Sequence, residues 1–140
     1  MPIENLARSD VVTAREDESV RELATRMDES KVGSIVITDG NEPVGIVTDR
    51  DLALRVIGDG TDPASTTAGE VMTDSLTTVD ETDGFYRATE LMSEHGIRRL
   101  PVCNDKNELV GIITSDDLTE LLAEEQMQLS DVIQAQRPAY

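Results

Sequence analysis

The sequence is poor in several residue types that would point to common functions. It has a single cysteine, Cys103, so no internal disulfide can form and nothing suggests an oxidising compartment. Tryptophan is absent, and Phe85, Tyr86 and Tyr140 offer few platforms on which single-stranded nucleic acid could stack. No apolar run approaches the roughly 20 residues of a membrane-spanning helix, and the N-terminus lacks the features of a secretory signal. We therefore expect a cytoplasmic protein that spans no membrane.

Basic residues are also scarce. Twelve lysines and arginines stand against 29 acidic residues, giving a net charge of −17, and only Lys31 and Lys106 are lysines. Proteins that bind duplexes usually present a basic footprint, so this balance argues against nucleic acid as a partner. Acid spread along the whole chain is typical of a protein from a halophilic archaeon, because salt screens its self-repulsion. The alternative is an ordinary acidic protein that faces a basic partner.

What the chain does contain is an internal repeat. Residues 45–53 read GIVTDRDLA and residues 111–119 read GIITSDDLT, an offset of 66 that drops to 65 further upstream. The extra residue lies in a predicted turn, where insertions are best tolerated. We therefore divide the chain into a first copy with its linker at 1–62, a second copy at 63–123, and a helical extension and tail at 124–140.

Each copy predicts a strand, a helix, two strands and a closing helix. Extended segments at 11–14 and 76–79 come first, and later strands are expected at 34–38, 44–48, 100–103 and 110–114. Apolar residues at helical spacing predict the first helix of each copy: Val20, Leu23, Ala24 and Met27, then Phe85, Ala88, Met92 and His95. Ser19 and Glu22 should form a capping box, and Gly58 should end the first closing helix with a positive φ.

One copy alone is too small to cover both faces of its apolar strands. We therefore expect an α+β fold in which two βαββα units pack sheet against sheet. The pair should have pseudo-two-fold symmetry and clefts between the units.

Several motifs resemble the CBS domain pair, or Bateman module. They are the repeated Gly-apolar-apolar-Thr-x-x-Asp-Leu, the stretch HGIRRLPVCNDKNELVGIITSDDL at 95–118, and the lead-ins GEVMTDSLTTV at 69–79 and IENLARSDVVTA at 3–14. The resemblance covers residues 3–123. It implies an adenosine-containing regulatory ligand (AMP, ADP, ATP or S-adenosylmethionine) between the two units, a separate regulated protein as partner, and a homodimer. It implies no cofactor, and we expect a stand-alone module that is not an enzyme.

The repeated Thr48-x-x-Asp51 and Thr114-x-x-Asp117 have two compatible interpretations. A threonine followed by an acid three residues later is a capping-box helix start. The resemblance implies in addition that the aspartates bind ribose hydroxyls and the threonines contact phosphate or sugar. Both can hold at once, since a helix N-terminus also attracts anions.

The adjacent Arg98 and Arg99 are unexpected in so acidic a chain. They could form surface salt bridges of little worth. They could instead hold a phosphate in bidentate fashion, as similar family members do with basic residues at this place. The first copy has Gly33 and Ser34 there, so we expect unequal sites. We expect the helix-start acids and the arginine pair to converge on one shared hollow, with the pocket that contains the arginines preferring nucleotides.

The remaining candidates have plain structural alternatives. The resemblance places Thr13 and Thr78 in the adenine pocket, although both also suit strands. We expect His95 on the inward side of its helix and Cys103 as a small buried apolar residue, and no motif predicts a metal site. Residues 118–136 predict a long last helix, either packed with a frayed end or serving as a dimer contact or docking surface.

A second class of function remains open from the sequence. The chain could be an assembly module whose clefts are filled by side chains and bind nothing. Catalysis is disfavoured, because no nucleophile is paired with a base and the single histidine lacks an orienting partner.

Overall fold

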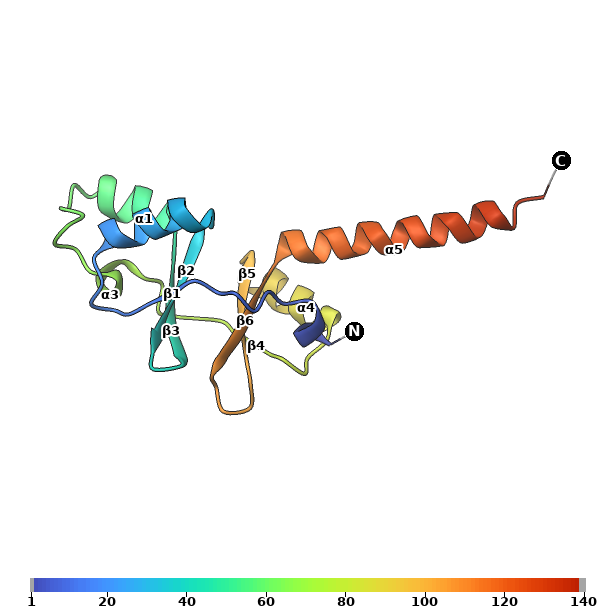
Figure 1. The fold of residues 1–140 in the computed structure, drawn as a ribbon, viewed down its shortest axis with the longest axis horizontal. Helices are drawn as coiled ribbons and strands as arrows, with labels where there is room; N and C mark the ends of the chain where they lie inside the picture. The colour runs from blue at the N-terminus through green and yellow to red at the C-terminus, as the bar shows by residue number, and fades with distance from the viewer. Residues whose placement is uncertain (1, 139–140) are drawn as a thin grey trace.

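The computed structural model describes residues 2–138 and has two similar halves, each built on a three-stranded sheet (Figure 1). The first half contains β1 (Thr13–Ala14), α1 (Val20–Ser30), β2 (Ser34–Asp39), β3 (Glu42–Thr48), α2 (Asp49–Leu52) and the π-helical turn η2 (Ala53–Ile57). The second contains β4 (Val79–Asp80), α4 (Phe85–His95), β5 (Arg99–Cys103), β6 (Leu109–Thr114) and α5 (Ser115–Ala135). Two short helices, η1 (Ile3–Asn5) and α3 (Ala68–Val71), lie in the lead-in segments. The α+β pair of βαββα units is thereby confirmed.

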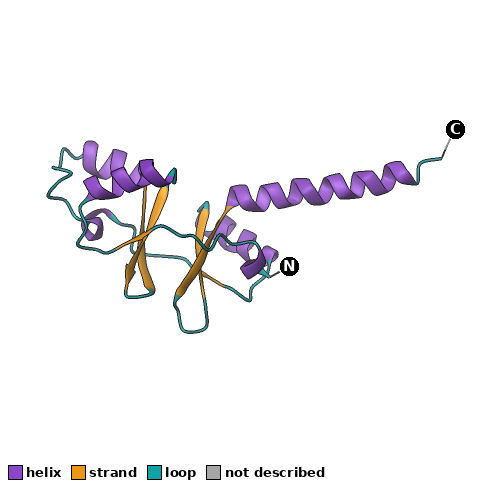
Figure 2. Ribbon diagram, in the orientation of Figure 1, coloured by secondary structure: helices purple, strands orange, loops and turns teal. Residues whose placement is uncertain are grey.

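The two sheets have the same topology and register, and their hairpins are drawn as neighbouring pairs of strands in Figure 2. In each, the first strand is parallel to the second and the second is antiparallel to the third. Ser34 is opposite Thr48 in the first sheet, and Arg99 is opposite Thr114 in the second. Ser34 and Arg99 are therefore equivalent under the pseudo-two-fold. Both hairpins contain an irregularity at equivalent places, and the extra residue of the second copy follows it.

Each sheet is covered on both faces. The helix side of the first sheet buries Ile35 and Ile37 completely, and the equivalent Leu100 and Val102 are buried in the second. Successive strand residues point to opposite faces. The residues between them, Val36 and its equivalent Pro101, are also fully buried, so the faces without helices are covered as well. The hairpin tips are joined by hydrogen bonds, including Leu109 N–H to the Asn41 carbonyl at 2.8 Å.

The two lead-in segments are exchanged between the halves. Residue 3 belongs to the core of the second half, and Arg8 pairs with Ile112 of β6 through hydrogen bonds of 2.9 and 3.0 Å. In return, α3 packs in the core of the first half, and Thr73 pairs with Ile46 of β3 in the same manner. Each core is thus completed by the segment that leads into the other half. The sequence division at residue 62 stays a prediction.

Three local expectations were wrong. Gly58 has φ −62°, because the closing helix ends in a wider turn in which the Gly58 N–H bonds to the Ala53 carbonyl; the positive φ of 68° occurs at Gly60. His95 is exposed, because the buried stripe of α4 runs through Ala88, Leu91 and Met92 and ends before the last helical residue. Ala24 is also exposed.

Other local features follow the residues that predict them. The Ser19 hydroxyl caps α1 by accepting from the Glu22 N–H at 3.2 Å, which is half of the expected capping box. Cys103 is buried on β5, and burial raises the pKa of its thiol against the opposing effect of the Thr78 hydroxyl. None of the helices within residues 2–138 is long and apolar enough to cross a bilayer.

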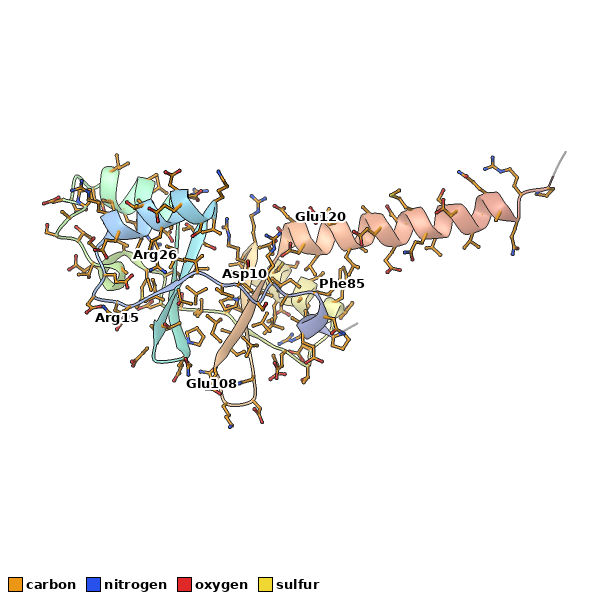
Figure 3. All side chains as sticks on the ribbon, viewed as in Figure 1. Asp10, Arg15, Arg26, Phe85, Glu108 and Glu120 are labelled. Carbon is orange, nitrogen blue, oxygen red and sulfur yellow. The ribbon has the colours of Figure 1, made fainter. Side chains whose placement is uncertain are left out.

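Helix α5 leaves the body of the molecule soon after it begins (Figures 1 and 3). Leu118 is buried in the second core, whereas Leu122, Leu129, Val132 and Ile133 are 50–64% exposed. Their spacing places them on the same side of the helix as Leu118. The tail residue Tyr140 lies outside the described part of the chain.

Candidate functional site

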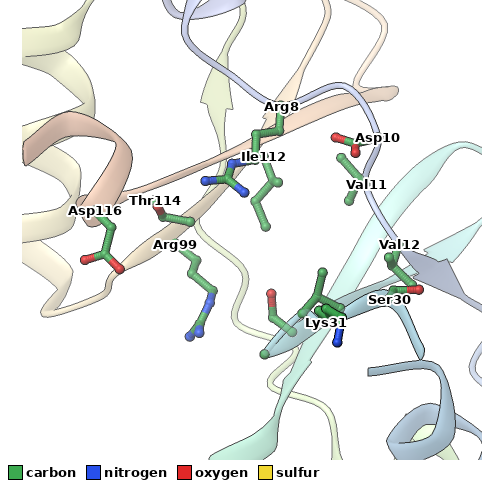
Figure 4. Close-up of a pocket in the computed structure, with 13 residues that line it drawn as sticks. Arg8, Asp10, Val11, Val12, Ser30, Lys31, Arg99, Ile112, Thr114 and Asp116 are labelled. Carbon is green, nitrogen blue, oxygen red and sulfur yellow. The ribbon is translucent and has the colours of Figure 1, made fainter. Parts of the chain in front are cut away.

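Two clefts lie between the halves, and both contain residues predicted from the sequence. The first, of about 530 Å³, is lined by residues that include Thr48, Arg50, Asp51 and Thr73 on one side and Ile97, Arg98 and Arg99 on the other. We call it the Asp51 cleft. The second, of about 340 Å³, is lined by residues that include Arg8, Lys31, Gly33, Arg99, Thr114 and Asp116 (Figure 4). We call it the Arg8 cleft.

The helix starts hold the two candidate aspartates in the same way. Thr48 accepts from the Asp51 N–H at 3.1 Å while the Asp51 carboxylate accepts from the Thr48 N–H at 2.9 Å. Thr114 and Asp117 repeat this arrangement at 3.2 and 3.0 Å. The two side chains are 15% and 13% exposed. The capping-box interpretation is therefore confirmed at both positions, and it fixes the direction of each carboxylate.

The second oxygen of each carboxylate has a different environment. Asp117 Oδ1 accepts from Arg8 at 2.8 Å. Burial tends to raise the pKa of Asp117, but the hydrogen bonds from Arg8 and Thr114 outweigh it and hold the pKa below its ordinary value. Asp51 Oδ1 has Arg55 at 3.7 Å and accepts no hydrogen bond from residues 2–138. Asp51 thus keeps an oxygen free to accept from a ligand.

The two arginines differ in exposure and in the clefts that they line. Arg98 is mostly exposed, lies 3.8 Å from the equally exposed Asp116, and lines the Asp51 cleft. Arg99 is half-buried and lines both clefts. Within residues 2–138 its guanidinium has neither an ion-pair partner within 4.0 Å nor a hydrogen bond. The arginine pair therefore lines the same cleft as Asp51 of the first copy. Asp117, which follows the pair in the chain, lines neither of the two clefts.

Thr13 and Thr78 line neither cleft. Thr13 lies in β1 opposite Val36, and its carbonyl accepts from Arg26. Thr78 directly precedes β4, where its hydroxyl contacts the thiol of Cys103. The adenine-pocket role that the resemblance implies for both threonines stays a prediction.

Two cationic residues of the Arg8 cleft were missed from the sequence. Arg8 is the repeat equivalent of Thr73, and the repeat offset could have drawn attention to it. Lys31 ends α1 in a left-handed conformation, with φ 55°. Among the described residues, no group of three or more His, Cys, Asp or Glu side chains could hold a metal ion.

Comparison with known proteins gives a consistent result. The CBS domain model matches residues 3–58 and again residues 68–124. A protein of Methanopyrus kandleri is 38% identical over 117 residues, which are 83% of this chain and 60% of that relative, so the chain spans less than two thirds of its length.

Two similar solved structures contain adenosine compounds. A CBS domain protein from Pyrobaculum aerophilum complexed with AMP is 31% identical, with a TM-score of 0.76 over 84% of this chain and 89% of that one. A CBS domain pair in complex with 5′-methylthioadenosine and S-adenosyl-L-methionine is 25% identical, with a TM-score of 0.80 over 89% and 98%. Two family matches that span most of the chain, together with the repeated halves and their paired clefts, show that this chain belongs to the CBS domain family as a tandem pair.

Proposed function

We propose that the chain is a regulatory module that binds an adenosine-containing ligand between its halves and signals to a separate partner protein. The observation that carries this proposal is the Asp51 cleft. It presents an Asp51 oxygen that accepts no hydrogen bond within residues 2–138, and opposite it Arg98 and Arg99 of the second half. AMP in one relative and S-adenosylmethionine in another support the ligand class, which we take as AMP, ADP, ATP or S-adenosylmethionine.

The chemistry of the Asp51 cleft suits such a ligand. Asp51 Oδ1 can accept from the ribose hydroxyls, because Oδ2 is already engaged by the Thr48 N–H. Arg98 and Arg99 would hold phosphate through charge-assisted hydrogen bonds. Ile46 and Ile97 supply apolar surface for the base. We assign to the second cleft Thr114, which lines it, and Asp117, which does not line it but is engaged by Arg8 at its edge.

Signalling would follow from ligand contacts that cross the pseudo-two-fold. A ligand that touches Asp51 on one half and Arg98 on the other binds best at one relative placement of the halves, and it favours that placement by its difference in affinity. We propose that a separate protein reads the change.

Calorimetry with AMP, ADP, ATP and S-adenosylmethionine tests this proposal. At least one of them should bind, and Asp51→Asn should weaken it by about tenfold or more, because a charged acceptor is lost. Asp39→Asn, an exposed acid in the hairpin of the same half, is the matched control and should leave binding unchanged. Absence of binding by all four compounds to a protein with native circular dichroism would refute the proposal.

A second candidate is an assembly module, and the exposed side of α5 favours it. Leu122, Leu129, Val132 and Ile133 form an apolar stripe that continues outward from the buried Leu118. We propose that this stripe contributes to a homodimer. We also propose a cytoplasmic location in a salt-rich cell, which the acidic composition supports.

A further inference from the structure

Arg99 occupies a special position because both clefts include its side chain. It begins β5 opposite Thr114 and extends into the hollow between Asp116 on one side and Lys31 on the other (Figure 4). It reaches the first half closely: a Cβ on Gly33 would lie 3.1 Å from a terminal nitrogen of Arg99. The absence of a side chain at Gly33 is what leaves room for this guanidinium.

The pseudo-two-fold does not supply a second such group. The equivalent of Arg99 is Ser34, which occupies the same register position opposite Thr48. A serine hydroxyl is short and uncharged, so it cannot replace a guanidinium that reaches across to the other half. The module therefore has one guanidinium at a place where exact symmetry would give two.

The other cations favour the Asp51 cleft as the place where Arg99 is used. Arg50 and Arg98 also line the Asp51 cleft, beside an Asp51 oxygen that accepts no hydrogen bond within residues 2–138. In the Arg8 cleft, Arg8 is engaged by Asp117 at 2.8 Å, and it takes the oxygen that a ribose would need. Lys31 remains there as an exposed point charge without the planar fork of an arginine.

We propose that Arg99 can bind the phosphate of only one ligand at a time. The module therefore binds one phosphate-bearing adenosine ligand tightly, in the Asp51 cleft, and a second one only weakly. This inference rests on the proposed function. A guanidinium that grips a phosphate in bidentate fashion has its donors committed to that group. Once Arg99 is held in the Asp51 cleft, the Arg8 cleft loses a cation that it would need for its own phosphate. Adenosine has no phosphate, so its affinity should not depend on Arg99.

The test is calorimetry of the full chain with AMP and, separately, with adenosine. We expect one tight AMP site per chain and a second AMP site whose affinity is lower by about tenfold or more. For adenosine, which has no phosphate charge, Arg99 should cause no difference in affinity between the two clefts. Arg99→Gln should lower the ratio of AMP affinity to adenosine affinity by about tenfold or more. Arg87→Gln removes an exposed arginine on α4 that lines neither cleft; it is the control and should leave that ratio unchanged.

Two further variants locate the tight site. Asp51→Asn should abolish tight AMP binding, whereas Asp39→Asn, the exposed acid of the same half, should preserve it. Two equal AMP sites in the unaltered chain, or an unchanged affinity ratio in Arg99→Gln, would overturn the shared-arginine inference and leave the proposed function standing. Failure of AMP, ADP, ATP, S-adenosylmethionine and adenosine to bind folded protein would overturn both, whereas failure of AMP alone would overturn only the shared-arginine inference.

Discussion

Replacement of Gly111 by alanine tests the exchange of lead-in segments directly. The Arg8 carbonyl crosses β6 at this glycine, and an added Cβ would lie 2.8 Å from that oxygen and 3.2 Å from the Ala7 side chain. The oxygen belongs to backbone that makes both hydrogen bonds to Ile112, so it cannot retreat without weakening them. The lead-in must therefore shift.

The expected cost follows from these contacts. Two backbone hydrogen bonds at about 0.5–1.5 kcal/mol each set a loss of about 1–3 kcal/mol. The reduced freedom of the unfolded chain returns about 0.4–1 kcal/mol for a glycine-to-alanine change. We expect Gly111→Ala to lower the free energy of unfolding by about 1–2 kcal/mol.

The equivalent Gly45→Ala is the matched comparison. Its added Cβ would meet the Met72 side chain at 2.5 and 2.9 Å, and the Thr73 carbonyl at 3.0 Å. The thioether can rotate away because methionine is flexible, so we expect a smaller loss than at Gly111. Urea denaturation followed by circular dichroism measures both variants. Equal stabilities for Gly111→Ala and the unaltered chain would refute the account of the crossing.

The remaining predictions concern charge and the last helix. Arg8→Met should lower the free energy of unfolding at pH 7 by about 0.5–1 kcal/mol, since Arg8 is largely exposed and its ion pair is screened. Because the folded pKa of Asp117 is depressed below its ordinary 3.8, this difference should be present above that pH and shrink as the pH falls through the acid range. Unfolding curves from pH 7 to pH 3 would contradict the assignment if the difference stayed constant. Leu129→Glu together with Ile133→Glu should convert a dimer into a monomer, as measured by light scattering, without loss of helix content by circular dichroism. An unchanged mass would show that α5 does not form the dimer interface. Molar KCl should raise the melting temperature relative to dilute buffer, because salt screens a net charge of −17. A melting temperature independent of KCl would count against a salt-adapted surface.

The repeat made most of the fold predictable. Each strand and helix was supported by two copies of the same pattern, so the hairpins at 34–48 and 99–114 were located within one or two residues. The lead strands are shorter than expected, because pairing in each is limited to two residues beside β2 or β5.

The candidate site was harder to assemble from the chain order. Arg98 and Arg99 precede Asp117 in the sequence, yet the pseudo-two-fold turns Arg98 toward Asp51 of the other copy. A sequence repeat shows which elements each copy contains, but it does not show how the two copies pack against each other. The acid of one copy that lies near the arginines of the other could therefore not be predicted. Arg8 was missed for a related reason: its side chain matters because its backbone is anchored to Ile112, a contact far away in the chain.

Because the lead-ins are exchanged, the two halves should also unfold as one cooperative unit. Removing the first half would leave a cavity in the second core where Ile3 packs. Removing the second half would leave a cavity in the first core where Ala68 and Val71 pack. Melting should accordingly proceed in one concerted step, with no stage at which one lobe persists alone. A ligand that binds between the halves, as we propose, would then act on the whole fold and not on one half alone.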